Sequence, residues 1–241
     1  MISIIIIVKN DRRIERVLAK LQDMQSSKPF EVIVVDASEG KLDDIKTIYS
    51  FVQWIPYVNK DKSRTYAEQR NIGIKKAKGE IIAFIDADCI PEDTWINNLI
   101  KPIYSEKEAF ISGSIKPIDK NNAHIEENYS KYRDECETMN MAVTKELVEH
   151  VGLFDESMEG CEDSDFCIRA REKGYKIRFQ KSAVVYHDWG GVMQNIKRSF
   201  NGGKDRASLY FKHPKLLFSL TINNIYTFYY IAFILFLPLA F

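Results

Sequence analysis

The chain has 241 residues and a mass of 28.0 kDa, and its 34 basic and 34 acidic side chains give a formal net charge of zero. A chain of this length can build one substantial core with an appendage, and two full domains are not expected. The balanced charge excludes a general attraction to nucleic acid, so binding partners must be inferred from local sites.

Strands and helices alternate along the first third of the chain. Mostly apolar runs predict buried strands at residues 1–8, 30–35, 52–57 and 80–85, and the last of these has no polar break after Glu80. Apolar residues at helical spacing predict helices at residues 12–24, 42–49 and 65–77. This order predicts right-handed crossovers and a mostly parallel central sheet flanked by helices, and Gly79 is expected to cap the third helix.

The remaining elements are shorter. Strands are predicted at residues 109–115, 139–143, 175–179 and 183–186. Helices are predicted from Pro91 to about residue 103, and at residues 145–151 and 162–173. The polar interval 119–137 is expected to cross the functional site as a helix or a loop.

The most informative feature is the strand at 80–85, which leads directly into two carboxylates, Asp86 and Asp88. Ligands of open α/β sheets bind at the carboxyl ends of such strands. Two carboxylates one residue apart can approach a single hard cation, which indicates metal-assisted handling of phosphate. A solvated turn is the alternative for this pair.

Further motifs follow the other predicted strands. The first strand ends in Val8-Lys9-Asn10, and the second in Asp36-Ala37-Ser38-Glu39-Gly40. Downstream lie Arg70-Asn71-Ile72-Gly73, Gly152-Leu153-Phe154-Asp155-Glu156, Glu162-Asp163-Ser164-Asp165-Phe166 and Val185-Tyr186-His187. Each motif is weak alone, but the ordered set resembles the family 2 glycosyltransferases, which have the GT-A fold, over about residues 2–190.

The resemblance implies an inverting transfer of a sugar from a UDP- or GDP-sugar to a hydroxyl acceptor. It implies that Asp163 is the catalytic base, with Glu162 as the second choice. Nucleotide-sugar binding is expected at Val8, Asn10, Asp36, Ser38, Arg70, Asp86 and Ala87. The resemblance also implies that Asp88 holds Mg²⁺ or Mn²⁺, and in some relatives a histidine near the place of His187 completes the metal shell.

Most of these residues also have simpler structural explanations. A turn explains Asp36 equally well. The alternative for Arg70 is a surface salt bridge, for Asp163 helix capping, which would be preferred without the resemblance, and for His187 a surface histidine. The Val8-Lys9-Asn10 segment replaces the family's usual Pro-Thr-Tyr-Asn, which leaves base recognition open. A Gln-x-x-Arg-Trp motif is absent, which disfavours a processive synthase.

Three other functions are alternatives to glycosyl transfer. A sugar nucleotidyltransferase would need a glycine-rich phosphate loop after the first strand, and a dinucleotide-binding dehydrogenase would need Gly-x-Gly-x-x-Gly there. Neither follows Val8. A non-catalytic sugar-binding or nucleotide-binding protein of the same fold is the third possibility, and the acidic residues Asp36, Asp86, Asp88 and Asp163 argue against it.

The C-terminal segment differs from the rest of the chain, because residues 216–241 carry no charge. We expect a hydrophobic membrane anchor there, against a buried or interfacial helix as the alternative. The expected division is therefore 1–190 for the glycosyltransferase domain, 191–215 for a basic amphipathic connector and 216–241 for the anchor. Basic residues before the anchor predict the cytoplasmic face of the membrane. Because the anchor would hold the site near the bilayer surface, a lipid-linked glycan or polysaccharide intermediate is the expected acceptor.

The four cysteines, Cys89, Cys136, Cys161 and Cys167, have neither zinc-site spacing nor the density of a disulfide scaffold. We expect reduced thiols. The apolar first residues lack the basic start and the cleavage site of a secretion signal, so they are expected to form a core strand.

Overall fold

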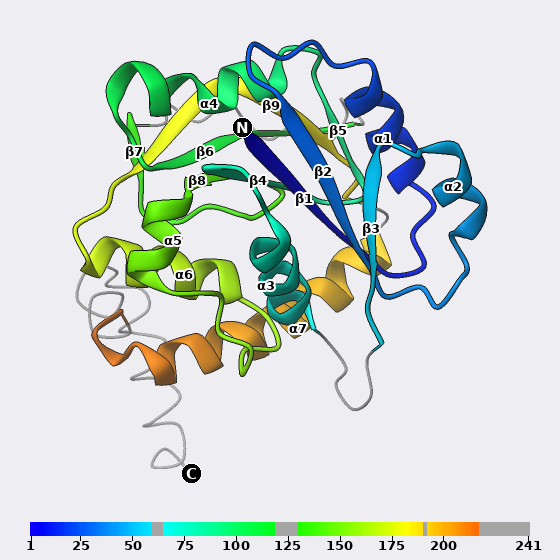
Figure 1. Cartoon of the computed structure of the whole chain (residues 1–241). Helices are drawn as coiled ribbons and strands as arrows, with labels where there is room; N and C mark the ends of the chain where they lie inside the picture. The colour runs from blue at the N-terminus through cyan, green and yellow to red at the C-terminus, as the bar shows by residue number, and fades with distance from the viewer. Residues whose placement is uncertain (59–64, 119–129, 190–191, 217–241) are drawn as a thin grey trace.

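The computed structural model describes residues 1–58, 65–118, 130–189 and 192–216. Within these ranges the strands are β1 (Ile2–Val8), β2 (Phe30–Asp36), β3 (Val52–Pro56), β4 (Ile81–Ile85), β5 (Cys89–Pro91), β6 (Phe110–Pro117), β7 (Tyr132–Arg133), β8 (Asn140–Thr144) and β9 (Ile177–His187). The helices are α1 (Ile14–Gln22), α2 (Asp43–Ile48), α3 (Tyr66–Lys76), α4 (Trp95–Glu106), α5 (Lys145–Val151), α6 (Glu162–Glu172) and α7 (Val192–Lys212). Figure 1 shows the strands gathered into a central sheet with helices around it.

The sheet is mixed, with the strand order β3-β2-β1-β4-β8-β6-β9-β5 and β7 beside β9. Strands β1 to β4 are parallel as predicted, and β9 is parallel to β6. However, β8 runs antiparallel to both β4 and β6, and β5 and β7 run antiparallel to β9. The prediction of a mostly parallel sheet is therefore too simple, because an apolar run signals burial on both faces and carries no information on strand direction.

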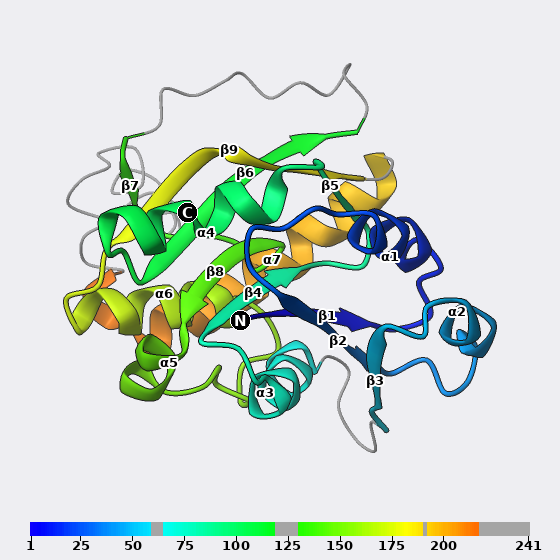
Figure 2. The ribbon, with the colours of Figure 1, turned by 45° about the horizontal axis from the view of Figure 1, so that its top comes forward.

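An apolar core lies on each face of the sheet. On one face α1, α2 and α4 pack through side chains such as Leu18, Ile45 and Leu99. On the other face α3, α5 and α6 pack through Leu147, Phe166 and their neighbours. Figure 2 shows α1 and α3 on opposite sides of β1 and β4, so the molecule has three layers, α/β/α.

Two glycines allow close contact between α3, the turn after it and β1. A Cβ at Gly73 would lie 2.6 Å from Cγ2 of Ile5, and one at Gly79 would lie 2.7 Å from the backbone nitrogen of Ser3. The prediction that Gly79 caps α3 is wrong, because the C-cap is Ala77 in an extended conformation. Gly79 is required instead because only a residue without a side chain fits against the backbone of β1.

The two strands predicted at 175–179 and 183–186 form one long strand, β9, which pairs with β6 across a register shift after Gly113. The buried amide of Asn140 fastens this irregularity. Its Nδ2 donates to the carbonyl oxygens of Ser114 and Ala183, both at 2.8 Å, and its Oδ1 accepts from Trp95 Nε1 at 2.9 Å. The bulge and its amide thereby fix the course of β9 toward His187.

The predicted helix start at Pro91 is also wrong. Residues 89–91 form β5, which pairs with the end of β9, and α4 begins at Trp95. The pairing sets Cys89 directly opposite His187. As a result, the residue after Asp88 lies beside the last residue of β9.

In the part of the chain that the structure describes, no helix has both the length and the apolar character needed to cross a bilayer. The predicted anchor lies outside the described residues except for Leu216, as do residues 119–129 of the interval that the sequence leaves unassigned. Helix α7, which covers most of the predicted connector, packs on the domain. Its Leu209 is fully buried with Met158 and Ile168.

Candidate functional site

A cavity of about 770 Å³ opens where β1, β4 and β9 end and where α6 begins. Eight of the predicted site residues line it, namely Val8, Arg70, Asp86, Ala87, Asp88, Glu162, Asp163 and His187. These residues come from five separate stretches of the chain, and the carboxyl-end rule for α/β sheets explains why they meet.

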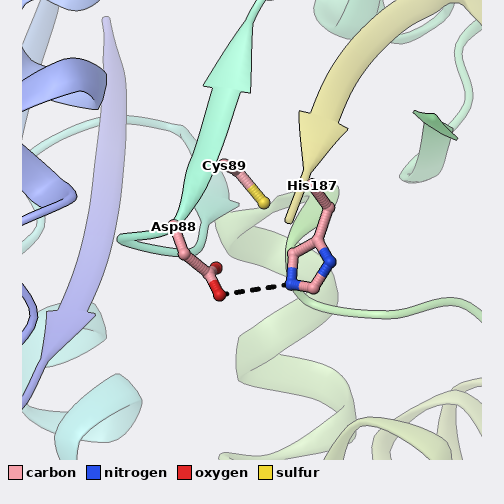
Figure 3. Close-up of side chains that lie close together, drawn as sticks. All are labelled: Asp88, Cys89 and His187. Atoms are coloured by element: carbon pink, nitrogen blue, oxygen red, sulfur yellow. Dashed lines mark ion pairs between the residues drawn. The ribbon is translucent and has the colours of Figure 1, made fainter. Parts of the chain in front are cut away.

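Asp88 and His187 face each other across the end of the sheet (Figure 3), with Oδ2 of Asp88 3.3 Å from Nε2 of His187. His187 is 4% exposed, and its Nδ1 has no hydrogen-bond partner among the described residues. Two ligands of one divalent ion, each bonded at about 2.0–2.2 Å, lie about this far apart. A carboxylate oxygen and an imidazole nitrogen suit Mn²⁺ and related ions, so these two residues fit a metal.

Cys89 borders the same position, and its Sγ lies within 4.8 Å of the Asp88 and His187 ligand atoms. Burial, together with the charges of Asp86 and Asp88, raises the pKa of the Cys89 thiol far above its ordinary value. A neutral thiol packed in the core forms an apolar wall behind the carboxylate and the imidazole.

A buried guanidinium links the two acidic motifs. Arg70, on α3, is 5% exposed and forms a salt bridge with Glu162, while its Nη2 lies 3.6 Å from Asp86 Oδ1. Desolvation alone would lower the pKa of Arg70, but the charges of Glu162 and Asp86 outweigh it and raise that pKa. Arg70 therefore ties the strand-end carboxylate of β4 to the first turn of α6.

Asp163 differs from its neighbour because it has no basic partner in direct contact among the described residues. Its Oδ1 accepts only from the backbone nitrogen of Ser164, at 2.8 Å. Burial and the charge of Glu162 raise the pKa of Asp163 to about 7. The residue before the pair, Cys161, has a φ of 58°, a conformation that non-glycine residues adopt rarely and often at functional sites.

Asn71, from the Arg70 motif, and Arg169, on α6, act as scaffold for this arrangement. Asn71 donates to the carbonyl of Phe154 at 2.9 Å and accepts from its backbone nitrogen at 3.0 Å, which joins α3 to the turn after α5. Arg169 donates to Asp165 at 2.8 Å and to the carbonyls of Val151 and Leu153. Both contacts hold the first turn of α6 in place against α3.

The other three predicted residues form a cluster of their own at the ends of β1 and β2, and they are not among the residues that line the cavity. Asp36 accepts from the backbone nitrogen of Ser38 at 2.8 Å and pairs with Lys46 at 3.0 Å. Ser38 in turn accepts from the backbone nitrogen of Asn10 at 2.7 Å. In this structure, the turn expected as the alternative for Asp36 is present.

The cavity also contains residues that the sequence did not single out. Gln69 is 3% exposed and lines the cavity, and its Oε1 has no hydrogen-bond partner within the described ranges. Asp11, just beyond β1, lines the cavity and binds Arg13. Asp11 lies three residues after the end of the first strand, and this closeness to a strand end is a signal that could have identified it. Gln69 sits mid-helix next to Arg70, and only the fold reveals which way it faces.

Comparison with known proteins agrees with the fold and with the family that the sequence resembles. The chain is 24% identical over 224 residues to the glycosyltransferase AglE of Haloferax volcanii, covering 87% of this chain and 74% of that protein. The mannosyltransferase PcManGT of Pyrobaculum calidifontis, solved with GDP-Man and Mn²⁺, superposes with a TM-score of 0.66 at 20% identity. GalNAc-T7, solved with UDP, GalNAc and Mn²⁺, superposes with a TM-score of 0.64 at 18% identity.

The two solved structures cover 82% and 78% of this chain, and the chain spans 59% and 44% of theirs, respectively. They establish the GT-A-like α/β fold. The sequence model of glycosyl transferase family 2 matches residues 3–158, which include the first four strands, the Asp86 and Asp88 pair and the turn after α5. The chain therefore belongs to glycosyl transferase family 2, a family of enzymes.

Proposed function

We propose that this protein transfers a sugar from a UDP- or GDP-sugar to a hydroxyl acceptor, with inversion at the anomeric carbon. The observation that carries the proposal is that Asp163, with a pKa of about 7, shares one cavity with Asp86 and Asp88. The presence of GDP-Man or UDP in the structures of PcManGT and GalNAc-T7 supports a nucleotide-sugar donor.

In this proposal Asp163 is the general base. Its ionised carboxylate accepts the proton of the acceptor hydroxyl while the hydroxyl oxygen bonds to the anomeric carbon and the bond to the diphosphate breaks. A single displacement of this kind inverts the anomeric configuration. A pKa near 7 leaves about half of the carboxylate ionised at neutral pH and keeps it basic, which is the balance that general-base catalysis favours.

The remaining residues have binding and positioning roles. Asp88 and His187 would hold Mg²⁺ or Mn²⁺, which supplies positive charge beside the departing diphosphate when bound. Arg70 holds Asp86 and Glu162 in place, so Glu162 acts as a positioning residue and not as the base. Gln69 lines the cavity, and its Oε1 has no hydrogen-bond partner among the residues that the structure describes, which favours a ligand that hydrogen bonds there.

The acceptor and the location of the enzyme are proposed from the sequence. The uncharged segment 216–241 would hold the domain at the cytoplasmic face of a membrane, so that a lipid-linked glycan or polysaccharide intermediate can reach the cavity. Residues 1–190 would then be the catalytic domain and 191–215 the connector. A truncated chain ending at residue 215 that retained full activity on a lipid-linked acceptor, and still sedimented with membranes, would contradict this part.

Nucleoside diphosphate release from a panel of UDP- and GDP-sugars, measured with Mn²⁺ and with EDTA, tests the central proposal. We expect release that requires the metal, that Asp88→Asn abolishes and that Asp163→Asn reduces while nucleotide binding persists. Asp93→Asn is the matched control, because this carboxylate is exposed and, within the described part of the chain, pairs only with Lys20 on the surface. Full transfer by Asp163→Asn would refute the assignment of the base.

The same assay separates the alternatives. A sugar nucleotidyltransferase would join a nucleoside triphosphate to a sugar phosphate and release pyrophosphate. A non-catalytic binding protein would bind UDP or GDP without metal-dependent turnover. The model of glycosyl transferase family 2 matches residues 3–158. This match favours glycosyl transfer over nucleotidyl transfer and over binding without catalysis.

A further inference from the structure

Arg13 lies next to the proposed metal site, although no motif drew attention to it. Its Nη2 is 3.3 Å from Oδ2 of Asp88, and its Nη1 is 3.4 Å from Oδ2 of Asp188, which directly follows β9. The Asp88 oxygen that faces Arg13 is the same atom that lies 3.3 Å from His187 Nε2. A divalent ion bound between Asp88 and His187 would thus contact Oδ2 of Asp88, the same oxygen that faces the positively charged Arg13.

The position of Arg13 does not depend on Asp88. Asp11 holds the guanidinium with three contacts, from Nε to Oδ1 at 2.9 Å, from Nε to Oδ2 at 3.1 Å and from Nη2 to Oδ2 at 2.6 Å. Asp11 also accepts from the backbone nitrogen of Arg13 at 3.0 Å, which fixes both residues at the start of α1. Arg13 can therefore release Asp88 to an incoming cation and keep its main partner.

Repulsion is the expected consequence, because the guanidinium cannot lose its proton and carries its charge at every working pH. We propose that Arg13 competes with the divalent cation for Asp88, so that the ion binds firmly only together with a nucleoside diphosphate. This inference rests on the metal site of the proposed function. It adds an order of binding, in which the negative charge of the nucleotide offsets the repulsion from Arg13.

The test is Mn²⁺ affinity, measured from the electron paramagnetic resonance of free Mn²⁺, without nucleotide and with UDP or GDP. Without nucleotide, we expect Arg13→Gln to bind Mn²⁺ about tenfold more tightly than the wild type, since one nearby positive charge is removed. The gain in Mn²⁺ affinity from the nucleotide should fall by a similar factor. Arg13→Lys keeps the charge and should stay close to the wild type.

Arg12→Gln is the matched control. It removes the same charge at the adjacent position, where Arg12 pairs with Asp44 on the surface and both side chains are more than half exposed. If Mn²⁺ binding by Arg13→Gln equals or falls below that of Arg12→Gln, the inference about Arg13 is overturned. If the wild type binds no Mn²⁺ even with UDP and GDP, the metal site of the proposed function is overturned instead. Thermal unfolding of each variant verifies that it is folded.

Discussion

Replacement of Asp163 by Asn should make the protein less active and, at alkaline pH, more stable. Its pKa of about 7 exceeds the ordinary value of 3.8, so the folded protein holds this proton more tightly than the unfolded chain does. Above pH 3.8 the ionised carboxylate opposes folding, and its cost grows until the pH passes about 7. Asparagine cannot ionise, so the variant avoids this cost.

The size of the effect follows from the two pKa values. One pKa unit corresponds to about 1.4 kcal/mol, so the gain in the free energy of unfolding for Asp163→Asn should approach about 4 kcal/mol at pH 8. At pH 5 the cost of ionising Asp163 has accumulated only between pH 3.8 and pH 5, so the gain in the free energy of unfolding should be about 1–2 kcal/mol. Transfer should fall by about 10²–10⁴-fold, which is the usual contribution of a general base.

Urea denaturation of the wild type and the variant at pH 5 and pH 8 measures the stability, and kcat/KM from pH 5 to 9 measures transfer. The wild-type kcat/KM should rise with pH through about 7, because ionised Asp163 is the active form. Asp155→Asn is the matched control of opposite sign. Lys212 lowers the pKa of Asp155, so this variant should lose stability equally at pH 5 and pH 8. A gain for Asp163→Asn that does not grow with pH would refute the reasoning.

Three further substitutions test the scaffold by urea denaturation at pH 7. Arg70→Met should lower stability by about 3–5 kcal/mol because it leaves Glu162 buried and unpaired, and adding Glu162→Gln should restore part of the loss; no restoration would contradict the pairing. Gly79→Ala should cost about 1–3 kcal/mol through its clash with β1, whereas Gly203→Ala, with open space around it in α7, should gain up to about 1 kcal/mol. Equal effects of the two alanines would refute the close-approach explanation. Asn140→Leu should cost about 3 kcal/mol or more, since three hydrogen bonds are lost, and a near-neutral result would show that the bulge holds without it.

The sequence predicted the elements that depend on burial and on strand ends. The runs that became β1 and β2 are mostly apolar and β4 is apolar throughout, and a strand that leads into Asp86 and Asp88 must place them at the ligand edge of the sheet. The sequence also predicted the acidic start of α6. The structure adds the reason why Glu162 and Asp163 differ. Glu162 pairs with Arg70, whereas Asp163 has no basic partner in contact among the described residues. Burial and the charge of Glu162 raise the pKa of Asp163.

What the sequence could not provide are properties that arise only from neighbours in space. Strand direction beyond β4 depends on how β8 enters between β4 and β6, and a hydrophobic pattern does not record that. Gly79 was predicted as a helix cap because it follows the helix in the sequence. Its close approach to the backbone of β1 joins residues far apart in the chain, and only the fold shows it. Arg13 was missed for the same reason, since Asp88 is distant from it in sequence and adjacent to it in the fold.

The basic residues before the C-terminal segment have two possible explanations, namely ion pairs within the domain and the orientation of a membrane anchor. In the structure Lys204 pairs with Glu159, Arg206 with Glu135, and Lys212 with Asp155 and the fully buried Asp165. These charges fasten α7 to the domain, so they have a folding role whether or not a membrane is near. A charge-based rule for orientation counts them as evidence of the cytoplasmic side. Because pairing in the domain already explains Lys204, Arg206 and Lys212, the proposal of a membrane location depends mainly on the uncharged segment 216–241 and on the truncation that tests it.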